Sequence, residues 1–252
     1  MLLTKTAVVT GLSQGLSRVL ARWRKPFATH DPGKIVSDLA ISLALGGDCL
    51  ADAALLRSEP AVFGPVASDP TISRLISLLA GDAPAVLKAI DDARAQARAQ
   101  AWRLAGEHAP DHAVSVQRPL IIDVDATLVT AHSDKQNAKP TFKKGYGFHP
   151  LCVFVDHGAE GTGEPLAIQL RPGNAGSNTA ADHITVLRQA FTQLPGLPDH
   201  RPGKRVLVRV DGAGHSHKLI EWLTSQRVQY SVGFTLPGDV TELIEKIPNQ
   251  VW

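Results

Sequence analysis

Apolar residues recur at helical spacing along the N-terminal part of the chain. In the segment 33–47, Ile35, Leu39 and Leu43 lie four residues apart, and two glycines follow them. Positions with this spacing share one face of a helix, and glycine commonly ends a helix. The same kind of pattern predicts further helices in the segments 48–58, 68–81 and 83–106. We therefore expect an all-helical domain at residues 1–112.

The apolar pattern changes from helical to strand-like at about residue 114. Short apolar runs separated by glycine and proline follow, which is typical of strands. The predicted order is strand 116–129, strand 149–158, strand 163–174, helix 178–194, strand 204–214, helix 215–227, strand 228–236 and helix 238–247. This β-β-β-α-β-α-β-α order favours a mixed sheet with helices packed on it. An α/β domain is therefore expected at residues 113–252.

The composition limits the functions that the chain can have. With 252 residues, 44% of them hydrophobic, it can bury one large core and a smaller one. Its formal net charge of +2 is too mild to indicate a partner. Cys49 and Cys152 are the only cysteines and lie far apart, which predicts a reducing, cytoplasmic setting and argues against a zinc site. The N-terminal apolar run is too short and interrupted for a signal peptide or membrane span.

Two predicted strands run through apolar residues and then end in an acid. Asp125 ends "LIIDVD", with Asp123 on the same strand face, and Asp211 ends "VLVRVD". In the predicted order the first and fourth strands can be neighbours, which would bring Asp125 and Asp211 together. Converging carboxylates repel unless a cation lies between them, and oxygen ligands suit Mg²⁺ or Mn²⁺. Such a site is typical of phosphodiester chemistry, although either acid alone is equally consistent with a turn or a helix cap.

The segment between the first two predicted strands combines positive charge with aromatic rings. "KPTFKKGYGFHP" carries Lys143 and Lys144 next to Phe142 and Tyr146. Lysines contact phosphates and aromatic rings stack on splayed bases, so this segment is a candidate DNA-binding loop. The alternative is a solvated hairpin whose lysines protect a sheet edge.

The segment "SDPTISRLISLL" has the features of a helix start. Thr71, Ser73 and Arg74 fall in its first turns, where a recognition helix makes base and phosphate contacts. A shorter helix precedes it, so the pair resembles a helix-turn-helix. A basic run that would attract phosphates lies further upstream, at Arg18, Arg22, Arg24 and Lys25. A helical bundle used for dimerisation explains the same pattern, and both interpretations stay open.

Four stretches together resemble insertion-sequence transposases of the DDE class, whose catalytic core is RNase H-like. They are "IIDVDATLVTAHSDK", "KKGYGFHPLCVFVDHG", "LRPGNAGSNTAADH" and "VRVDGAGHS". The resemblance implies that Asp125, in an Asp-x-Thr pattern with Thr127, and Asp211 are catalytic metal ligands, with Asp123 as a supporting carboxylate. It also implies Mg²⁺ or Mn²⁺ as cofactor. Its partners would be double-stranded DNA with terminal inverted repeats, target DNA and a second copy of the chain, at the bacterial nucleoid.

The resemblance also implies a third acid, a glutamate on a later helix. Glu242 and Glu245 on the last predicted helix are candidates, but the surrounding residues do not match the family motif. We therefore expect a chain truncated before the third acid, which leaves open whether this chain cleaves DNA without the longer form. A non-catalytic DNA-binding fragment is one alternative. Another is a haloacid-dehalogenase-like phosphatase, in which Asp123 of a DxDxT motif would be the nucleophile and Asp125 the general acid.

Overall fold

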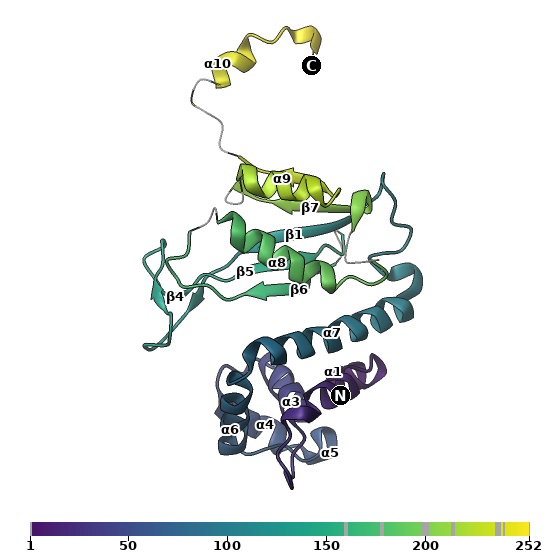
Figure 1. The fold of residues 1–252 in the computed structure, drawn as a ribbon, viewed down its shortest axis with the longest axis vertical. Coiled ribbons are helices and arrows are strands. Elements are labelled where there is room, and N and C mark those ends of the chain that lie inside the picture. Colours follow the sequence, from purple (N-terminus) through teal and green to yellow (C-terminus); the bar gives the residue numbers. More distant parts are fainter. Residues whose placement is uncertain are drawn as a thin grey trace. The chain divides into compact units, whose positions relative to one another are not determined.

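The chain forms two compact units (Figure 1). The structure, a computed structural model, describes residues 2–158, 161–176, 179–197, 202–212, 215–234, 238 and 240–251. Unit 1 comprises Met1–His112 with Thr192–Gly196, and unit 2 comprises Ala113–Phe191 with Leu197–Trp252. Within the described residues, no helix is long and apolar enough to cross a membrane.

Unit 1 is helical, as the apolar spacing predicts. Its helices are α1 (Leu2–Val9), α2 (Leu12–Leu20), α3 (Pro32–Ala44), α4 (Ala53–Arg57), α5 (Pro60–Phe63), α6 (Asp69–Ala80) and α7 (Ala83–Ala105). Their core is built on Leu20, Ile35, Ile72, Leu79 and Val86. The helices predicted in 33–47, 68–81 and 83–106 are confirmed, whereas 48–58 forms a 3-10 turn followed by the short α4.

Helices α1 and α2 lie in the predicted helical domain but were not predicted individually, because glycine and polar residues interrupt the apolar pattern of the first twenty residues. Close packing explains why α2 forms nevertheless. A Cβ at Gly33, in the first turn of α3, would collide with the backbone of Ser17 on α2. Gly15 of α2 lies against Ala93 of α7, where an added Cβ would meet the Ala93 Cβ at 3.5 Å. Small residues therefore let these helices approach closely, and tertiary packing outweighs weak helix propensity.

Unit 2 is built on a five-stranded mixed sheet in the order β6-β5-β1-β7-β8. The strands are β1 (Leu120–Ala126), β5 (Leu151–Val155), β6 (Glu164–Gln169), β7 (Val206–Val210) and β8 (Gln229–Val232). The hairpin strands β5 and β6 are antiparallel to their neighbours, whereas β7 is parallel to β1 and β8 to β7. The predicted adjacency of the first and fourth strands is therefore confirmed.

Two helices cover one face of this sheet, α8 (Ala180–Thr192) and α9 (His217–Ser225) (Figure 1). Their buried apolar residues include Leu187 on α8 and Leu223 on α9, and the ring of Phe191 stacks on Trp222 at a centroid distance of 5.9 Å. A further helix, α10 (Val240–Glu245), follows β8. A helical region is thus followed by a mixed sheet with helices packed on it, which confirms the predicted α/β fold class.

The lysine-rich segment forms a hairpin, the alternative that the sequence left open, and belongs to a second, three-stranded sheet. This sheet consists of β2 (Val129–Thr130), β4 (Tyr146–Phe148) and β3 (Lys139–Pro140), in the order β2-β4-β3. Two glycines allow its close packing. A Cβ at Gly147 would collide with the Val129 carbonyl, and a Cβ at Gly173 would collide with the Lys139 carbonyl. The loop that carries Gly173 is thus seated against this small sheet.

Candidate active site

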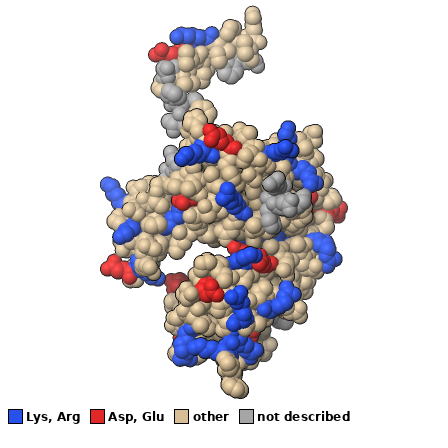
Figure 2. Space-filling view, viewed as in Figure 1, with Lys and Arg blue, Asp and Glu red and all other residues tan. Residues whose placement is uncertain are grey.

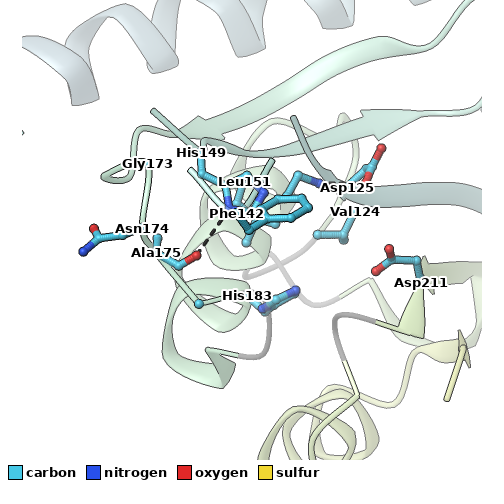
Figure 3. Close-up of a pocket in the computed structure, with 12 residues that line it drawn as sticks. Val124, Asp125, Phe142, His149, Leu151, Gly173, Asn174, Ala175, His183 and Asp211 are labelled. Atoms are coloured by element: carbon cyan, nitrogen blue, oxygen red, sulfur yellow. Dashed lines mark hydrogen bonds between the residues drawn. The ribbon is translucent and has the colours of Figure 1, made fainter. Parts of the chain in front are cut away.

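The two acids that end strands lie at the same edge of the large sheet. Val124 of β1 and Val210 of β7 are register partners in a parallel pair, so Asp125 and Asp211 follow at adjacent positions. Both side chains are exposed, and both line a cavity of about 540 Å³ (Figure 3). Asp125 accepts a hydrogen bond from the N–H of Ala126 at 2.8 Å. The fold thus brings together two carboxylates that are 86 positions apart in the sequence.

Asp123 has a different partner from Asp125, although both are on one face of β1. Its two carboxylate oxygens accept hydrogen bonds from Arg209 Nε at 2.6 Å and Arg209 Nη2 at 2.7 Å. Arg209 Nη2 also donates to Asp156 at 2.7 Å. The hydrogen bond to Asp123 is the main reason that the pKa of Arg209 is raised above its ordinary value, with Asp156 adding to it. Asp123 therefore belongs to an ion-pair row across β5, β1 and β7.

Two histidines form part of the cavity wall. His183 on α8 is 3% exposed, and its Nδ1 lies 3.0 Å from the carbonyl oxygen of Thr179. Because a carbonyl can only accept, Nδ1 carries the proton. Burial lowers the pKa of His183, so the ring is neutral near pH 7 and Nε2 is without a proton. In Figure 3 this ring extends from α8 toward the space between Val124 and Asp211.

The second histidine, His149, donates from Nδ1 to the carbonyl of Ala175 at 3.3 Å, the dashed line in Figure 3. This bond joins the end of the small sheet to the glycine-rich loop that follows β6. Sequence reasoning left His149 out of the site and did not consider His183. The signal for His183 in the sequence was weak, since a histidine on the apolar face of an amphipathic helix is usually a core residue. The position of His183 at the cavity depends on how α8 packs.

The predicted DNA-binding lysines are at the tip of the β3–β4 hairpin. Lys143 and Lys144 are exposed, and Lys143 Nζ lies 5.7 Å from the ring centroid of Phe142. Phe142 lines the cavity with Asp125 and Asp211. Tyr146 instead donates its hydroxyl to Asp134 at 3.1 Å. The hairpin tip therefore supplies positive charge and one aromatic ring at the rim of the acidic cavity.

The predicted helix-turn-helix residues lie in unit 1, in the first turns of α6. Ser73 and Arg74 are exposed, and Arg74 donates to the Thr71 hydroxyl at 3.1 Å. Thr71 and Arg74 share a small recess of about 120 Å³ with Arg24 and Lys25. Figure 2 shows Lys and Arg side chains gathered on the face of unit 1 that this view presents. The local charge is suited to contacts with phosphates.

The candidates for the third acid are on α10, where Glu242 and Glu245 are both exposed. Among the described residues, no third Asp, Glu, His or Cys groups with both Asp125 and Asp211 closely enough, within 4.8 Å, to share one ion. The group that meets this distance is Asp48, Cys49 and Asp52 in unit 1. There the Asp52 carboxylate accepts the N–H groups of residues 48 and 49, both at 2.9 Å, which is ordinary helix capping.

Comparison with known proteins decides the family. The family model for transposase DDE domain group 1 matches residues 1–252. The chain belongs to the DDE transposases. No curated protein matches it. Membership implies a role in DNA transposition and binding to DNA, and transposases of this family generally use divalent metal ions.

The structure of the DDE domain is consistent with a divalent ion at the two strand ends. Asp125 and Asp211 offer hard oxygen donors at one cavity, and a cation there would relieve their mutual repulsion. The phosphatase alternative gains no support from the family match. In addition, β1 continues into the small sheet, whereas a helix should follow the motif of those phosphatases.

Proposed function

We propose that unit 2 is the catalytic core that cuts DNA at the ends of an insertion sequence and joins those ends to target DNA. The observation that supports this most is the arrangement of Asp125 and Asp211, which end two adjacent parallel strands and line one cavity. These two carboxylates would hold Mg²⁺ or Mn²⁺. When bound, the ion would supply Lewis-acid stabilisation of phosphate oxygens and a more acidic attacking water.

The chain's own residues have separate parts in this proposal. Asp123 is ion-paired with Arg209 and lines a neighbouring cavity with Asp125 and Asp211, whereas Asp125 also lines the cavity that Phe142 borders. Lys143 and Lys144 attract the DNA backbone to the cavity rim. Glu242 and Glu245 on α10 are the candidates for the family's third acid.

Unit 1 would hold double-stranded DNA of the terminal inverted repeats. Thr71, Ser73 and Arg74 at the start of α6 would contact it, with the basic residues of the nearby recess adding phosphate contacts. Two copies of the chain would assemble on paired DNA ends, bound at the nucleoid in the cytoplasm. Recognition in one unit and chemistry in the other would explain why this chain has both a basic recess beside α6 and an acidic cavity.

Cleavage of a labelled duplex carrying the inverted repeats, with Mg²⁺ or Mn²⁺, tests the proposal. Asp125→Asn and Asp211→Asn should each lower the rate at least about a hundredfold while leaving DNA affinity unchanged. Binding of Mn²⁺, followed by electron paramagnetic resonance, should weaken in both variants. The matched control is Asp92→Asn, an exposed acid on α7 paired with Lys88. Arg74→Ala should lower DNA affinity without changing the rate of cleavage in the bound complex.

Other outcomes would contradict the proposal. If the wild-type chain binds the repeats but never nicks them, the chain is a non-catalytic DNA-binding protein. If Asp123→Asn alone removes activity and Asp211→Asn does not, the assignment of the metal ligands is wrong. Release of phosphate from a small phosphomonoester that depends on Asp123 would favour the phosphatase.

A further inference from the structure

An exposed aromatic ring lies at the rim of the acidic cavity. Phe142 is 69% exposed, yet it lines the cavity together with Asp125 and Asp211. Its ring contacts His149 at a centroid distance of 5.4 Å and an interplanar angle of 52°, so this packing leaves much of the ring uncovered. Figure 3 shows the ring next to Asp125. Because this ring borders a cavity that two carboxylates line, its open face is available to a ligand that enters the cavity.

The backbone holds this ring in place. At the hairpin tip, the N–H of Thr141 donates to the Gly145 carbonyl at 2.8 Å, and the N–H of Lys144 donates to the Thr141 carbonyl at 3.0 Å. The Thr141 hydroxyl accepts the N–H of Gly145 at 3.1 Å. Beneath the tip, the close approaches at Gly147 and Gly173 seat the small sheet against the loop after β6. Phe142 is therefore presented by a defined turn.

The charges around the ring specify the kind of ligand. Lys143 Nζ lies 5.7 Å from the ring centroid, Lys144 follows it, and both are exposed. The two carboxylates lie at the same cavity. A ligand that matches all three features has a flat aromatic face for the ring and phosphates for the lysines and for a metal ion at the acids. A nucleotide of a DNA strand has these features.

The base of that nucleotide cannot be paired and stacked in a duplex. Within a helix both faces of a base are covered by its neighbours, so the ring of Phe142 has no face to stack on. The cavity of about 540 Å³ falls in the range of small-ligand pockets. We propose that Phe142 stacks on a nucleobase that has left the duplex beside the acids. The substrate class is then DNA with an unpaired base at the processed position. This inference rests on the proposed function, because it concerns the same cavity.

Equilibrium binding of two DNA duplexes to the full chain tests the inference. The duplexes share one sequence but differ at one end, which is fully paired in one and mismatched in the other, and EDTA is present so that no cleavage intervenes. The wild-type chain should bind the mismatched end about tenfold more tightly, in line with the strength of base–aromatic stacking. Phe142→Ala should weaken binding of the mismatched end about tenfold and so remove this preference. Phe142→Trp should keep it.

The matched control is Phe27→Ala, which removes a fully exposed phenylalanine of unit 1 and should keep the full preference. The inference is wrong if the wild-type chain shows no preference, or if Phe142→Ala retains it. Thermal unfolding of the Ala variant and the result for the Trp variant separate loss of stacking from loss of folding. The two proposals can fail separately. If the preference for mismatched ends depends on Phe142 but Asp125→Asn and Asp211→Asn cleave DNA as fast as wild type, the proposed chemistry is wrong and this inference is supported.

Discussion

Asp123 and Asp125 have adjacent places on one strand face and different chemical surroundings. Asp123 is held by Arg209 through two hydrogen bonds, whereas Asp125 faces the cavity that Asp211 also lines. A carboxylate whose two oxygens both accept from a guanidinium has fewer lone pairs left for a metal ion, and the positive charge of Arg209 disfavours a cation beside it. The two acids of one motif are thus distinguished by the residue across the strand pair, since Arg209 is the register partner of Asp123.

His183 should make stability depend on pH in the mildly acidic range. Burial lowers its pKa in the folded chain below the ordinary 6.5, whereas the unfolded chain binds a proton at about that value. As pH falls below 6.5, the unfolded state gains protons that the folded state does not, so the free energy of unfolding falls until the folded pKa is reached. Urea unfolding at about pH 7.5 and about pH 5.5 should show a larger loss for wild type than for His183→Gln.

The control for this prediction is His112→Gln, an exposed histidine outside the cavity. That variant should lose as much stability as wild type when the pH is lowered. An equal pH dependence in wild type and His183→Gln would show that the ring is protonated in the folded state as readily as in the unfolded chain.

The sequence could indicate those site residues that belong to a local pattern, but not those whose position depends on contacts between distant segments. Asp125 and Asp211 could be proposed from the sequence because each comes at the end of a mainly apolar run, and a run is a local pattern. Arg209 as the partner of Asp123 depends on the register of two strands far apart in the sequence. His183 depends on how α8 packs. Phe142 was noticed as part of an aromatic and basic segment, but its place at the cavity requires the folded hairpin.

At the scale of elements, the large sheet was predictable and the small sheet was not. Strands of five to seven residues such as β7 and β1 give a clear apolar run. The strands β2, β3 and β4 have only two or three residues, which is too short for an alternating pattern to stand out. Their pairing depends instead on close backbone approaches at glycines, which are long-range contacts.

Gly173→Ala should therefore disturb the small sheet and the loop against it. The added Cβ would collide with the Lys139 carbonyl and lie 2.7 Å from the Gly147 carbonyl, and backbone atoms cannot move aside cheaply. We expect a loss of about 1–3 kcal/mol in unfolding free energy, typical of overpacking. Thermal unfolding measures the loss, and the preference for mismatched DNA ends should fall with it because Phe142 is displaced.

Gly176→Ala is the matched control in the same loop. Its added Cβ would meet nothing nearer than the Thr179 hydroxyl oxygen at 3.7 Å, an ordinary contact. This variant should keep both stability and DNA preference. If both glycine variants behave alike, the close approach at Gly173 does not hold the loop in place.

At the scale of the whole molecule, one segment of unit 1 comes from far along the chain. Periodicity indicates a change of structure near residue 113, but it gives no sign that Thr192–Gly196 belongs with the N-terminal helices. Gln193 shows why it does. This side chain is 1% exposed, accepts a hydrogen bond from Arg98 Nη1 at 2.9 Å and donates to the Asp91 carbonyl at 3.0 Å. Such a contact spans about a hundred residues and leaves no local pattern.

Gln193→Leu should consequently destabilise α7, although the substitution is remote from that helix in sequence. The variant removes an acceptor from the buried guanidinium of Arg98 and a donor from the Asp91 carbonyl, and hydrogen bonds to buried charged groups contribute about 1.5–3 kcal/mol. Since a chain with two units need not unfold in one step, hydrogen exchange at the α7 amides is the suitable measurement. Protection should fall across α7 and stay unchanged in β1.

The control is Gln136→Leu, at an exposed position of unit 2, which should change the protection of neither α7 nor β1. Unchanged protection of α7 in Gln193→Leu would mean that unit 1 is complete without the distant segment.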